Sequence, residues 1–200
     1  WVLRPSATAV ILAGGESLRM GSDKSMLEVD GQPMIGRVAD QLAFFPERLI
    51  GSNDPARFEF LRIPVVPDRI PGRGPLMGIL SCVDRAAFDL CFVTGCDIPI
   101  LNPRFILHLL AQADEHDIVM PRFSDGRVEP LLGVYRKTVV PVAQAIIERG
   151  GRRIVELFDH LRVRFVSGDG LSWYHNLNTV EDYRRWMAAS ASGPPDAPGP

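Results

Sequence analysis

The chain has 200 residues, 46% hydrophobic and 23% charged, close to the averages of soluble globular proteins and unlike disordered or collagen-like chains. Its 22 Lys and Arg against 24 Asp and Glu leave a formal net charge of −2, so we expect neither nucleic acid nor a membrane surface as a partner. No apolar run reaches the roughly 18 residues of a membrane-spanning helix. The three cysteines lack C-x-x-C spacing, which favours reduced thiols in a cytoplasmic protein.

Short apolar runs alternate with segments of helical periodicity along the chain. Strands are predicted over residues 8–12, 48–52, 63–66, 89–95, 117–121 and 128–135. Helices are predicted over residues 33–45, 74–87, 103–115 and 139–149. Such regular alternation is typical of right-handed crossover units. The predicted fold is therefore α/β, a three-layer, doubly wound and mostly parallel sheet with helices on both faces.

The domain organisation follows from length and composition. We expect residues 1–187 to form one domain, because the chain is close to the usual size of a single domain. From residue 188 onward, Ala, Ser, Gly and Pro predominate. Such a segment buries too little apolar area to offset the entropy of ordering it. Residues 188–200 are therefore predicted to form a flexible tail.

A glycine-rich loop follows the first predicted strand. Residues 12–24 read Leu-Ala-Gly-Gly-Glu-Ser-Leu-Arg-Met-Gly-Ser-Asp-Lys, without Walker A or G-x-G-x-x-G spacing. In open parallel sheets, ligands bind beyond the carboxyl ends of the strands. Glycines let backbone N–H groups approach a ligand, and Arg19 and Lys24 add two cations, so the loop suits phosphate. The same cations could instead pair with Glu16 and Asp23 in a solvated loop.

A carboxylate follows the most convincing buried strand. Asp97 comes just beyond residues 89–95, so its side chain is expected at the same sheet edge as the glycine-rich loop. Magnesium prefers one or two carboxylates together with water and phosphate oxygens, which Asp97 beside a triphosphate would provide. By residue type alone, a turn or helix-cap aspartate before Pro99 fits equally well.

The glycine-rich loop resembles the signature L-A-G-G-x-S-x-R-M-G-x-D-K of the molybdenum cofactor guanylyltransferases, the molybdopterin-guanine dinucleotide biosynthesis protein A family. That family is related to the sugar-phosphate and isoprenoid nucleotidylyltransferases. Further motifs follow in the family's order: Gly74-Pro75-Leu76 with Gly78-Ile79, Thr94-Gly95-Cys96-Asp97-Ile98-Pro99, Glu129-Pro130-Leu131 and Asn176-Leu177-Asn178-Thr179. The resemblance covers about residues 9–186. It implies a Rossmann-like nucleotidyltransferase fold.

The resemblance also implies an activity: magnesium-dependent transfer of GMP from GTP to the phosphate of molybdopterin, with release of pyrophosphate. Arg19, Lys24 and a magnesium ion held by Asp97 would then stabilise the charge that develops in the transition state. GTP and molybdopterin are the expected substrates. Transient contacts with proteins that deliver molybdenum cofactor, or with molybdoenzymes, would accompany this role.

The implied nucleotide site draws on several segments. The predicted GTP-binding residues are Leu12, Ala13, Gly14, Gly15, Lys24, Asn53, Asp68 and Asp97. A carboxylate can accept from both N1–H and the exocyclic amine of guanine, a donor pair that cytosine lacks. The sequence leaves open whether Asn53 or Asp68 would read the base. Ordinary turn chemistry is the alternative for both residues.

The implied second-substrate site involves two asparagines. Asn176 and Asn178 alternate, so in an extended segment they would face the metal or the acceptor phosphate from the opposite side. They could instead be turn residues before a last helix capped by Thr179. Arg152 and Arg153 suit either a phosphate or pterin contact or a solvated helix start.

Two other functions remain open at this point. One is cytidylyl or guanylyl transfer to a different phosphorylated acceptor, and the other is GTP binding without catalysis. Gly15 favours a purine nucleotide, because relatives that use a pyrimidine nucleotide tend to have Ala there. Intact Arg19, Lys24 and Asp97 favour an enzyme, since a binding module need not retain the contacts to metal and leaving group.

Overall fold

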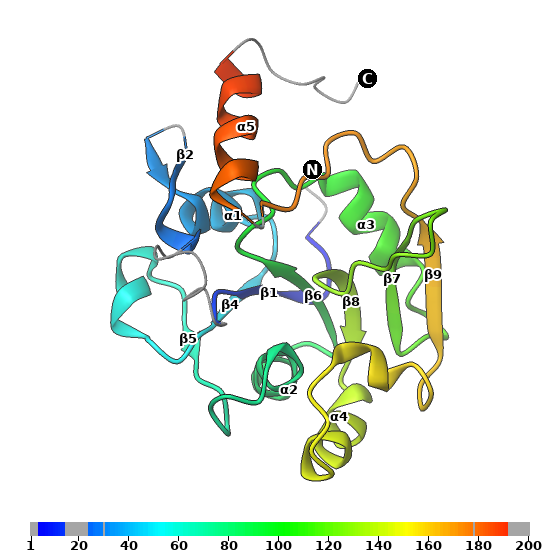
Figure 1. The fold of residues 1–200 in the computed structure, drawn as a ribbon. Coiled ribbons are helices and arrows are strands. Elements are labelled where there is room, and N and C mark those ends of the chain that lie inside the picture. The colour runs from blue at the N-terminus through cyan, green and yellow to red at the C-terminus, as the bar shows by residue number, and fades with distance from the viewer. Residues whose placement is uncertain (1–3, 15–23, 30, 178, 192–200) are drawn as a thin grey trace.

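The computed structural model describes residues 4–14, 24–29, 31–177 and 179–191. Its main sheet has seven strands in the order β5-β4-β1-β6-β8-β7-β9 (Figure 1). β8 pairs antiparallel with β6 and β7, and the remaining pairs of this sheet are parallel. The strand bounds are β1 Ala7–Leu12, β4 Glu47–Gly51, β5 Val65–Val66, β6 Leu90–Gly95, β7 Ile118–Arg122, β8 Leu132–Arg136 and β9 Val163–Ser167.

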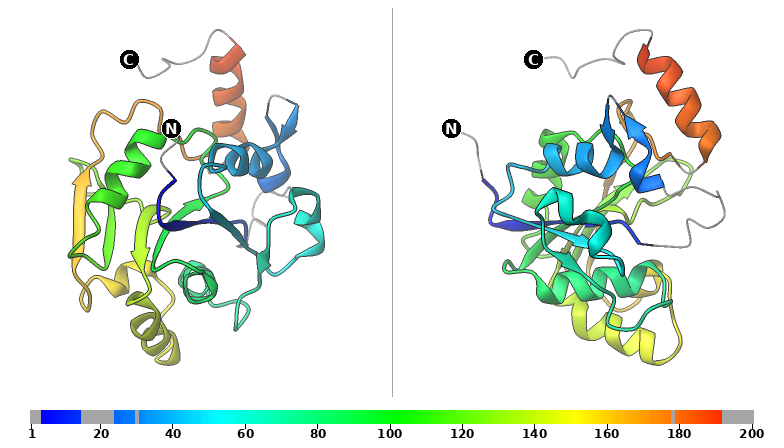
Figure 2. Two further views of the ribbon diagram at one scale, coloured as in Figure 1. Left: turned by 180° about the vertical axis from the view of Figure 1, so that it is seen from behind. Right: turned by 90° about the vertical axis from the view of Figure 1, so that its left-hand side faces the viewer.

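Four helices cover the two faces of this sheet. Helices α1 (Met34–Gln41) and α3 (Pro103–Ala111) lie on one face, and α2 (Pro75–Arg85) and α4 (Val139–Glu148) lie on the other (Figure 2). The predicted three-layer, mostly parallel α/β fold is confirmed.

The central strand β1 supplies both layers of the core. All six of its residues are buried, and their side chains alternate between the faces of the sheet. Ala9 and Ile11 belong to the apolar cluster under α1 and α3, whereas Val10 and Leu12 belong to the cluster under α2 and α4. Burial on both faces explains why this strand reads as a continuous apolar run rather than an alternating one.

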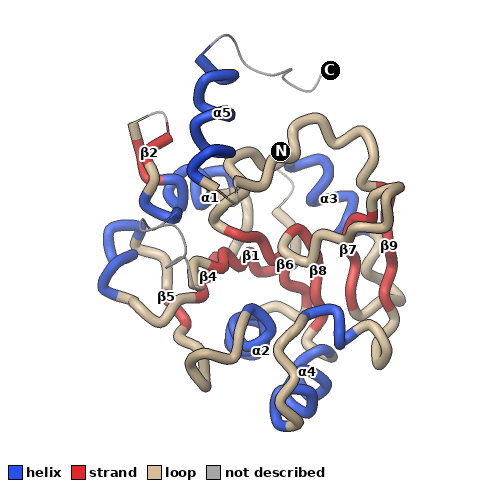
Figure 3. Tube along the Cα trace, viewed as in Figure 1, coloured by secondary structure: helices blue, strands red, loops and turns tan. Residues whose placement is uncertain are grey.

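A smaller third cluster joins an added hairpin to the last helix. The hairpin consists of β2 (Glu28–Val29) and β3 (Gln32–Pro33), and the helix is α5 (Val180–Ala191), as Figure 3 shows. Val29 packs with Leu177 and Trp186, and the Tyr183 hydroxyl donates to the Glu28 carbonyl. Short 3-10 turns complete the described elements at Lys24–Met26, Ala56–Leu61 and Ile154–Leu157.

Several predicted boundaries were wrong. The helices expected over residues 33–45 and 103–115 end at Gln41 and Ala111, and the strand expected from residue 128 begins at Leu132. In the last case Pro130 intervenes, and a proline has no N–H to donate to a ladder. The hairpin and β9 were not predicted, because two-residue strands and an edge strand carry little periodicity.

The predicted tail starts too early. Helix α5 continues to Ala191, past the expected boundary at Ala188. Alanine is a strong helix former, and the helix-breaking composition begins only at Gly193 and Pro194. Residues 192–200 lie outside the described residues. Among the described helices, none combines the length and apolar character that crossing a bilayer requires.

The buried carboxylate of Asp117 links β7, α4 and β9 at the end of the sheet where β7 and β9 begin. Asp117 is 7% exposed and precedes β7. It accepts hydrogen bonds from the Thr138 hydroxyl at 2.7 Å and from the Arg162 backbone N–H at 3.0 Å, at the starts of α4 and β9. Burial opposes the charge, but the hydrogen bonds from Thr138 and Arg162 outweigh it and lower the pKa of Asp117.

Substituting Asp117→Ala should lower the free energy of unfolding by about 1–3 kcal/mol at neutral pH, because the donors of Thr138 and Arg162 lose their partner. The folded-state pKa of Asp117 is depressed, so its contribution is complete above the unfolded pKa and is lost as pH falls through the folded value. Urea unfolding of both proteins from pH 7 to pH 3 measures this. A difference that did not shrink in acid would contradict the assignment.

Candidate active site

Backbone hydrogen bonds join the carboxyl ends of β1, β4 and β6, and these strand ends form the floor of the candidate site. Just past β1, the Ala13 N–H donates to the Gly51 carbonyl at 2.9 Å, and the Cys96 N–H donates to the Leu12 carbonyl at 3.1 Å. A Cβ on Gly51 would come within 2.6 Å of the Leu12 side chain. The floor therefore depends on a residue without a side chain at position 51.

A cavity of about 760 Å³ opens above this floor. Five of the predicted GTP-binding residues line it: Leu12, Ala13, Gly14, Asn53 and Asp68. The other lining residues are Gly51, Ser52, Asp54, Gly72, Gly74, Pro75, Gly78 and Arg152. Segments that are far apart in the chain thus form one glycine-rich wall, where a ligand can approach the backbone closely.

Asn53 and Asp68 form a reciprocal pair at the rim of this cavity. The Asn53 side-chain amide donates to Asp68 Oδ2 at 3.0 Å, and the Asp68 backbone N–H donates to Asn53 Oδ1 at 2.8 Å. Both the amide N–H and the amide oxygen of Asn53 are therefore engaged with Asp68. The arrangement orients the Asp68 carboxylate and leaves it acceptor capacity for a ligand.

Asp97 lies at the end of β6, with Lys24 nearby. Its Oδ1 is buried and has no hydrogen-bond partner among the described residues. Burial raises the pKa of Asp97, and the Lys24 ammonium charge and the backbone N–H of Asp97 itself partly offset that rise. The carboxylate folds back over Gly95, where a Cβ would collide with Oδ1. The cap of α3 is Asn102, whose side chain accepts from the Arg104 N–H at 2.9 Å, so Asp97 is not the cap.

Three more polar side chains lie beside Asp97. The Tyr174 hydroxyl donates to the Glu129 carboxylate, and the nearby Asn176 side chain lowers the pKa of both groups. Burial raises the pKa of Glu129, and the charge of Asp97 adds to the rise. Asn176 Oδ1 is buried and, like Asp97 Oδ1, lacks a partner in the part of the chain that the structure describes.

Comparison with known proteins identifies the family. Residues 9–163 match the family described as the MobA-like NTP transferase domain. The chain belongs to this family. A "Probable molybdenum cofactor guanylyltransferase" of Pelotomaculum thermopropionicum is 35% identical, covering 88% of this chain and 89% of that protein. A "Molybdenum cofactor guanylyltransferase" of Vibrio cholerae is 33% identical, covering 93% and 94%.

A solved structure with a similar fold agrees with this family assignment. A crystal structure of molybdopterin-guanine dinucleotide biosynthesis protein A from Archaeoglobus fulgidus has a TM-score of 0.80 and 23% sequence identity, covering 93% of this chain and 100% of that one. The resemblance drawn from the sequence motifs is confirmed, and the chain is a nucleotidyltransferase.

The donor set at Asp97 suits a hard cation in a MobA-like site. Two buried oxygens, Asp97 Oδ1 and Asn176 Oδ1, lack hydrogen-bond donors among the described residues. Among all the residues that the structure describes, no group of three or more His, Cys, Asp or Glu side chains could hold a metal by itself. A magnesium ion here would therefore draw most of its ligands from water and phosphate oxygens, as magnesium commonly does.

The structure describes some of the predicted site residues and leaves others outside the described ranges. The structure brings Lys24 close to Asp97. Asn176 precedes Leu177, whose N–H donates to the Asp97 carbonyl. Arg19, Gly15 and Asn178 lie outside the described residues, so their predicted roles stay predictions. Thr179 and Asp182 cap α5 reciprocally, with N–H to oxygen distances of 2.9 and 3.0 Å. The cap at Thr179, which the sequence left as the alternative interpretation of this segment, is present.

Two features of the site were not predicted as such. Glu129 and Tyr174 form a half-buried pair beside Asp97, although only the Glu129-Pro130-Leu131 motif marked that region in the sequence. Arg152, for which the sequence left two interpretations open, lines the glycine-rich cavity, whereas Arg153 pairs with Glu156 at 3.7 Å.

Proposed function

We propose that the chain is a magnesium-dependent guanylyltransferase that transfers GMP from GTP to the phosphate of molybdopterin and releases pyrophosphate. The observation that carries the proposal is the charge interaction of Lys24 with the Asp97 carboxylate, whose Oδ1 is buried, at the strand ends that border a glycine-lined cavity. The names of the relatives from Pelotomaculum thermopropionicum and Vibrio cholerae support the choice of guanine nucleotide and molybdenum cofactor.

The reaction is a displacement at phosphorus. An oxygen of the acceptor phosphate forms a bond to the α-phosphorus of GTP while the bond from that phosphorus to the bridging oxygen breaks, and the electron pair leaves with pyrophosphate. Negative charge grows on the leaving oxygen, and the Lys24 ammonium would stabilise it. The acceptor phosphate is already anionic, so no covalent protein nucleophile is required.

Magnesium bound by Asp97, with Asn176 Oδ1 as the second protein oxygen, would supply Lewis-acid charge neutralisation on the phosphates. Arg19 would contribute a second cation. Asp68 would read guanine through N1–H and the exocyclic amine, with Asn53 as the residue that orients the carboxylate. The catalytic domain would extend to Ala191, where helix α5 ends.

The direct test is pyrophosphate release measured with each of the four nucleoside triphosphates, with and without molybdopterin. We expect release only with GTP and molybdopterin together. Release with CTP, or with GTP and a phosphorylated sugar instead of molybdopterin, would favour transfer to another acceptor. Tight GTP binding by calorimetry without any release would favour a binding module.

Replacing Lys24 with Ala should lower kcat/KM by about 100-fold or more, the usual effect of losing one preorganised donor to developing charge. Lys24→Arg keeps the positive charge and should retain more activity. Steady-state kinetics with purified proteins measures both. Near-normal turnover of the Ala variant would refute the role of Lys24.

Asp97→Asn should abolish magnesium-dependent turnover while the fold persists, because the side-chain volume barely changes but the charge that attracts the cation is lost. Magnesium titration of turnover and circular dichroism measure the two properties. The control is Asp84→Asn, an aspartate on the exposed side of α2 that pairs with Arg69 and lines neither cavity. An unaltered magnesium titration in the Asp97 variant would count against the proposal.

A further inference from the structure

Helix α1 contacts both segments that carry the charged groups of the candidate site. The N–H of its first residue donates to the Leu27 carbonyl at 2.8 Å, and the helix packs against the 3-10 turn that begins with Lys24. Further along the same helix, the side chains of Arg37 and Gln41 reach the segment after β6, which carries Asp97. One helix therefore contacts the segment of the cation and the segment of the carboxylate.

The side chains of Arg37 and Gln41 converge on one carbonyl group. Arg37 Nε donates to the Pro99 carbonyl at 3.1 Å, and Gln41 Nε2 donates to the same oxygen at 3.0 Å. A carbonyl oxygen has two lone pairs, so the two donors use its acceptor capacity in full. Gln41 Oε1 also accepts from the Leu101 N–H at 2.8 Å. The two side chains thus hold the segment after β6 at two backbone positions.

The segment held in this way, residues 96–102, lies between β6 and α3 and belongs to neither element. Ile98 and Leu101 are buried in the core under α1 and α3, and they anchor the segment through apolar contacts. Pro99 between them is also buried and has no N–H, so its carbonyl requires donors from within the protein. The donors on α1 therefore help to decide where the backbone just beyond Asp97 lies.

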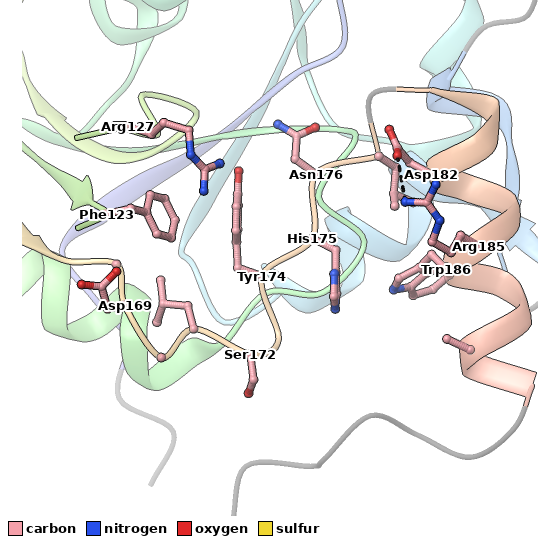
Figure 4. Close-up of a pocket in the computed structure, with 15 residues that line it drawn as sticks. Phe123, Arg127, Asp169, Ser172, Tyr174, His175, Asn176, Asp182, Arg185 and Trp186 are labelled. Atoms are coloured by element: carbon pink, nitrogen blue, oxygen red, sulfur yellow. Dashed lines mark ion pairs between the residues drawn. The ribbon is translucent and has the colours of Figure 1, made fainter. Parts of the chain in front are cut away.

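Arg37 also connects this segment to α5. Its Cζ lies 5.9 Å from the centroid of the Trp186 ring, within the range of a cation–π attraction. Trp186 lines a second cavity of about 740 Å³, which we call the aromatic cavity because Phe123 and Tyr174 line it as well (Figure 4). The guanidinium of Arg37 therefore links the segment after β6 to the helix beside that cavity.

We propose that Arg37 and Gln41 are positioning residues that hold the Asp97 carboxylate where it binds the magnesium ion of the transfer reaction. They act through the backbone of Pro99 and Leu101 rather than by touching the metal. Asp97 Oδ1 is buried without a partner among the described residues, and magnesium demands near-ideal octahedral geometry at short distances. A small shift of this backbone therefore weakens the metal site. The proposal rests on the proposed function, since it concerns the cation of that reaction.

Binding of a nucleotide with and without magnesium tests the proposal in the absence of turnover. The probe is guanosine 5′-(α,β-methylene)triphosphate, which cannot be cleaved at the α-phosphorus, titrated by calorimetry in Mg²⁺ or in EDTA. Gln41→Met and Arg37→Met remove the hydrogen-bonding groups and keep an unbranched side chain. Each should weaken binding in Mg²⁺ about tenfold, as is usual when a group that orients a metal ligand is lost. Affinity in EDTA should stay within about twofold of the wild-type value, because the metal ligand has no role there.

Two conservative variants separate positioning from damage to the fold. Arg37→Lys keeps a cationic donor for the Pro99 carbonyl, so it should bind the magnesium form more tightly than Arg37→Met does. Gln41→Glu keeps the acceptor for the Leu101 N–H and loses the donor to Pro99, so it reports on positioning even if Gln41→Met folds poorly.

Turnover supplies a second readout. In Gln41→Met and Arg37→Met, the magnesium concentration that gives half-maximal pyrophosphate release should rise about tenfold, in step with the weaker binding. Added magnesium should restore most of the lost kcat. A variant that is merely unfolded would instead show a lower kcat at every magnesium concentration.

The matched control is Gln144→Met, the same substitution at an exposed position of α4. Gln144 donates to Glu148 at 3.0 Å and lines neither cavity. This variant should keep the wild-type affinities in Mg²⁺ and in EDTA, and the wild-type magnesium requirement.

Wild-type affinity for the magnesium form in both Met variants would overturn the proposal. So would equal losses in Mg²⁺ and in EDTA, or a wild type that gains no affinity from magnesium. A wild type that gains affinity, with variants that lose this gain, would support the proposal even if no GMP reached molybdopterin. That last result would count against the proposed function alone.

Discussion

Asp97 keeps a carboxylate at the end of β6 where solvent is largely excluded, and Lys24 is the cation that partly compensates for the lost solvation. A lone buried charge costs free energy unless it is paired or coordinated. The unpartnered Oδ1 is therefore informative, because a fold retains such an atom when a ligand completes its environment. Gly95 gives this carboxylate room, since Asp97 Oδ1 occupies the space that a Cβ would take.

Backbone hydrogen bonds connect the two cavities through this aspartate. The Leu12 carbonyl accepts from Cys96, and the Asp97 carbonyl accepts from Leu177. Leu12 lines the glycine-rich cavity and Leu177 lines the aromatic one. Main-chain hydrogen bonds therefore fix the position of one cavity relative to the other. This rigidity suits a displacement whose rate depends on how the attacking oxygen and the phosphorus are aligned.

The hairpin and α5 lie outside the main sheet and pack together next to the site. Val29, shortly after Lys24, and Trp186, which lines the aromatic cavity, belong to one apolar cluster with Leu177. Packing in this cluster links the segment that carries the cation to the segment that carries Asn176. The segments that carry Lys24 and Asn176 therefore share a structural base outside the main sheet.

The sequence by itself determined the class of fold, the order of the main elements and the presence of Lys24 and Asp97 at loops after strands. Apolar periodicity and glycine positions are local properties, so they can be read along the chain. The relation of Asn53 to Asp68, and of Glu129 to Tyr174, was decided only by the tertiary structure. These partners are 15 and 45 residues apart, and no local pattern specifies a hydrogen bond over such a separation. The aromatic cavity likewise exists only because crossover connections bring three distant segments to one edge of the sheet.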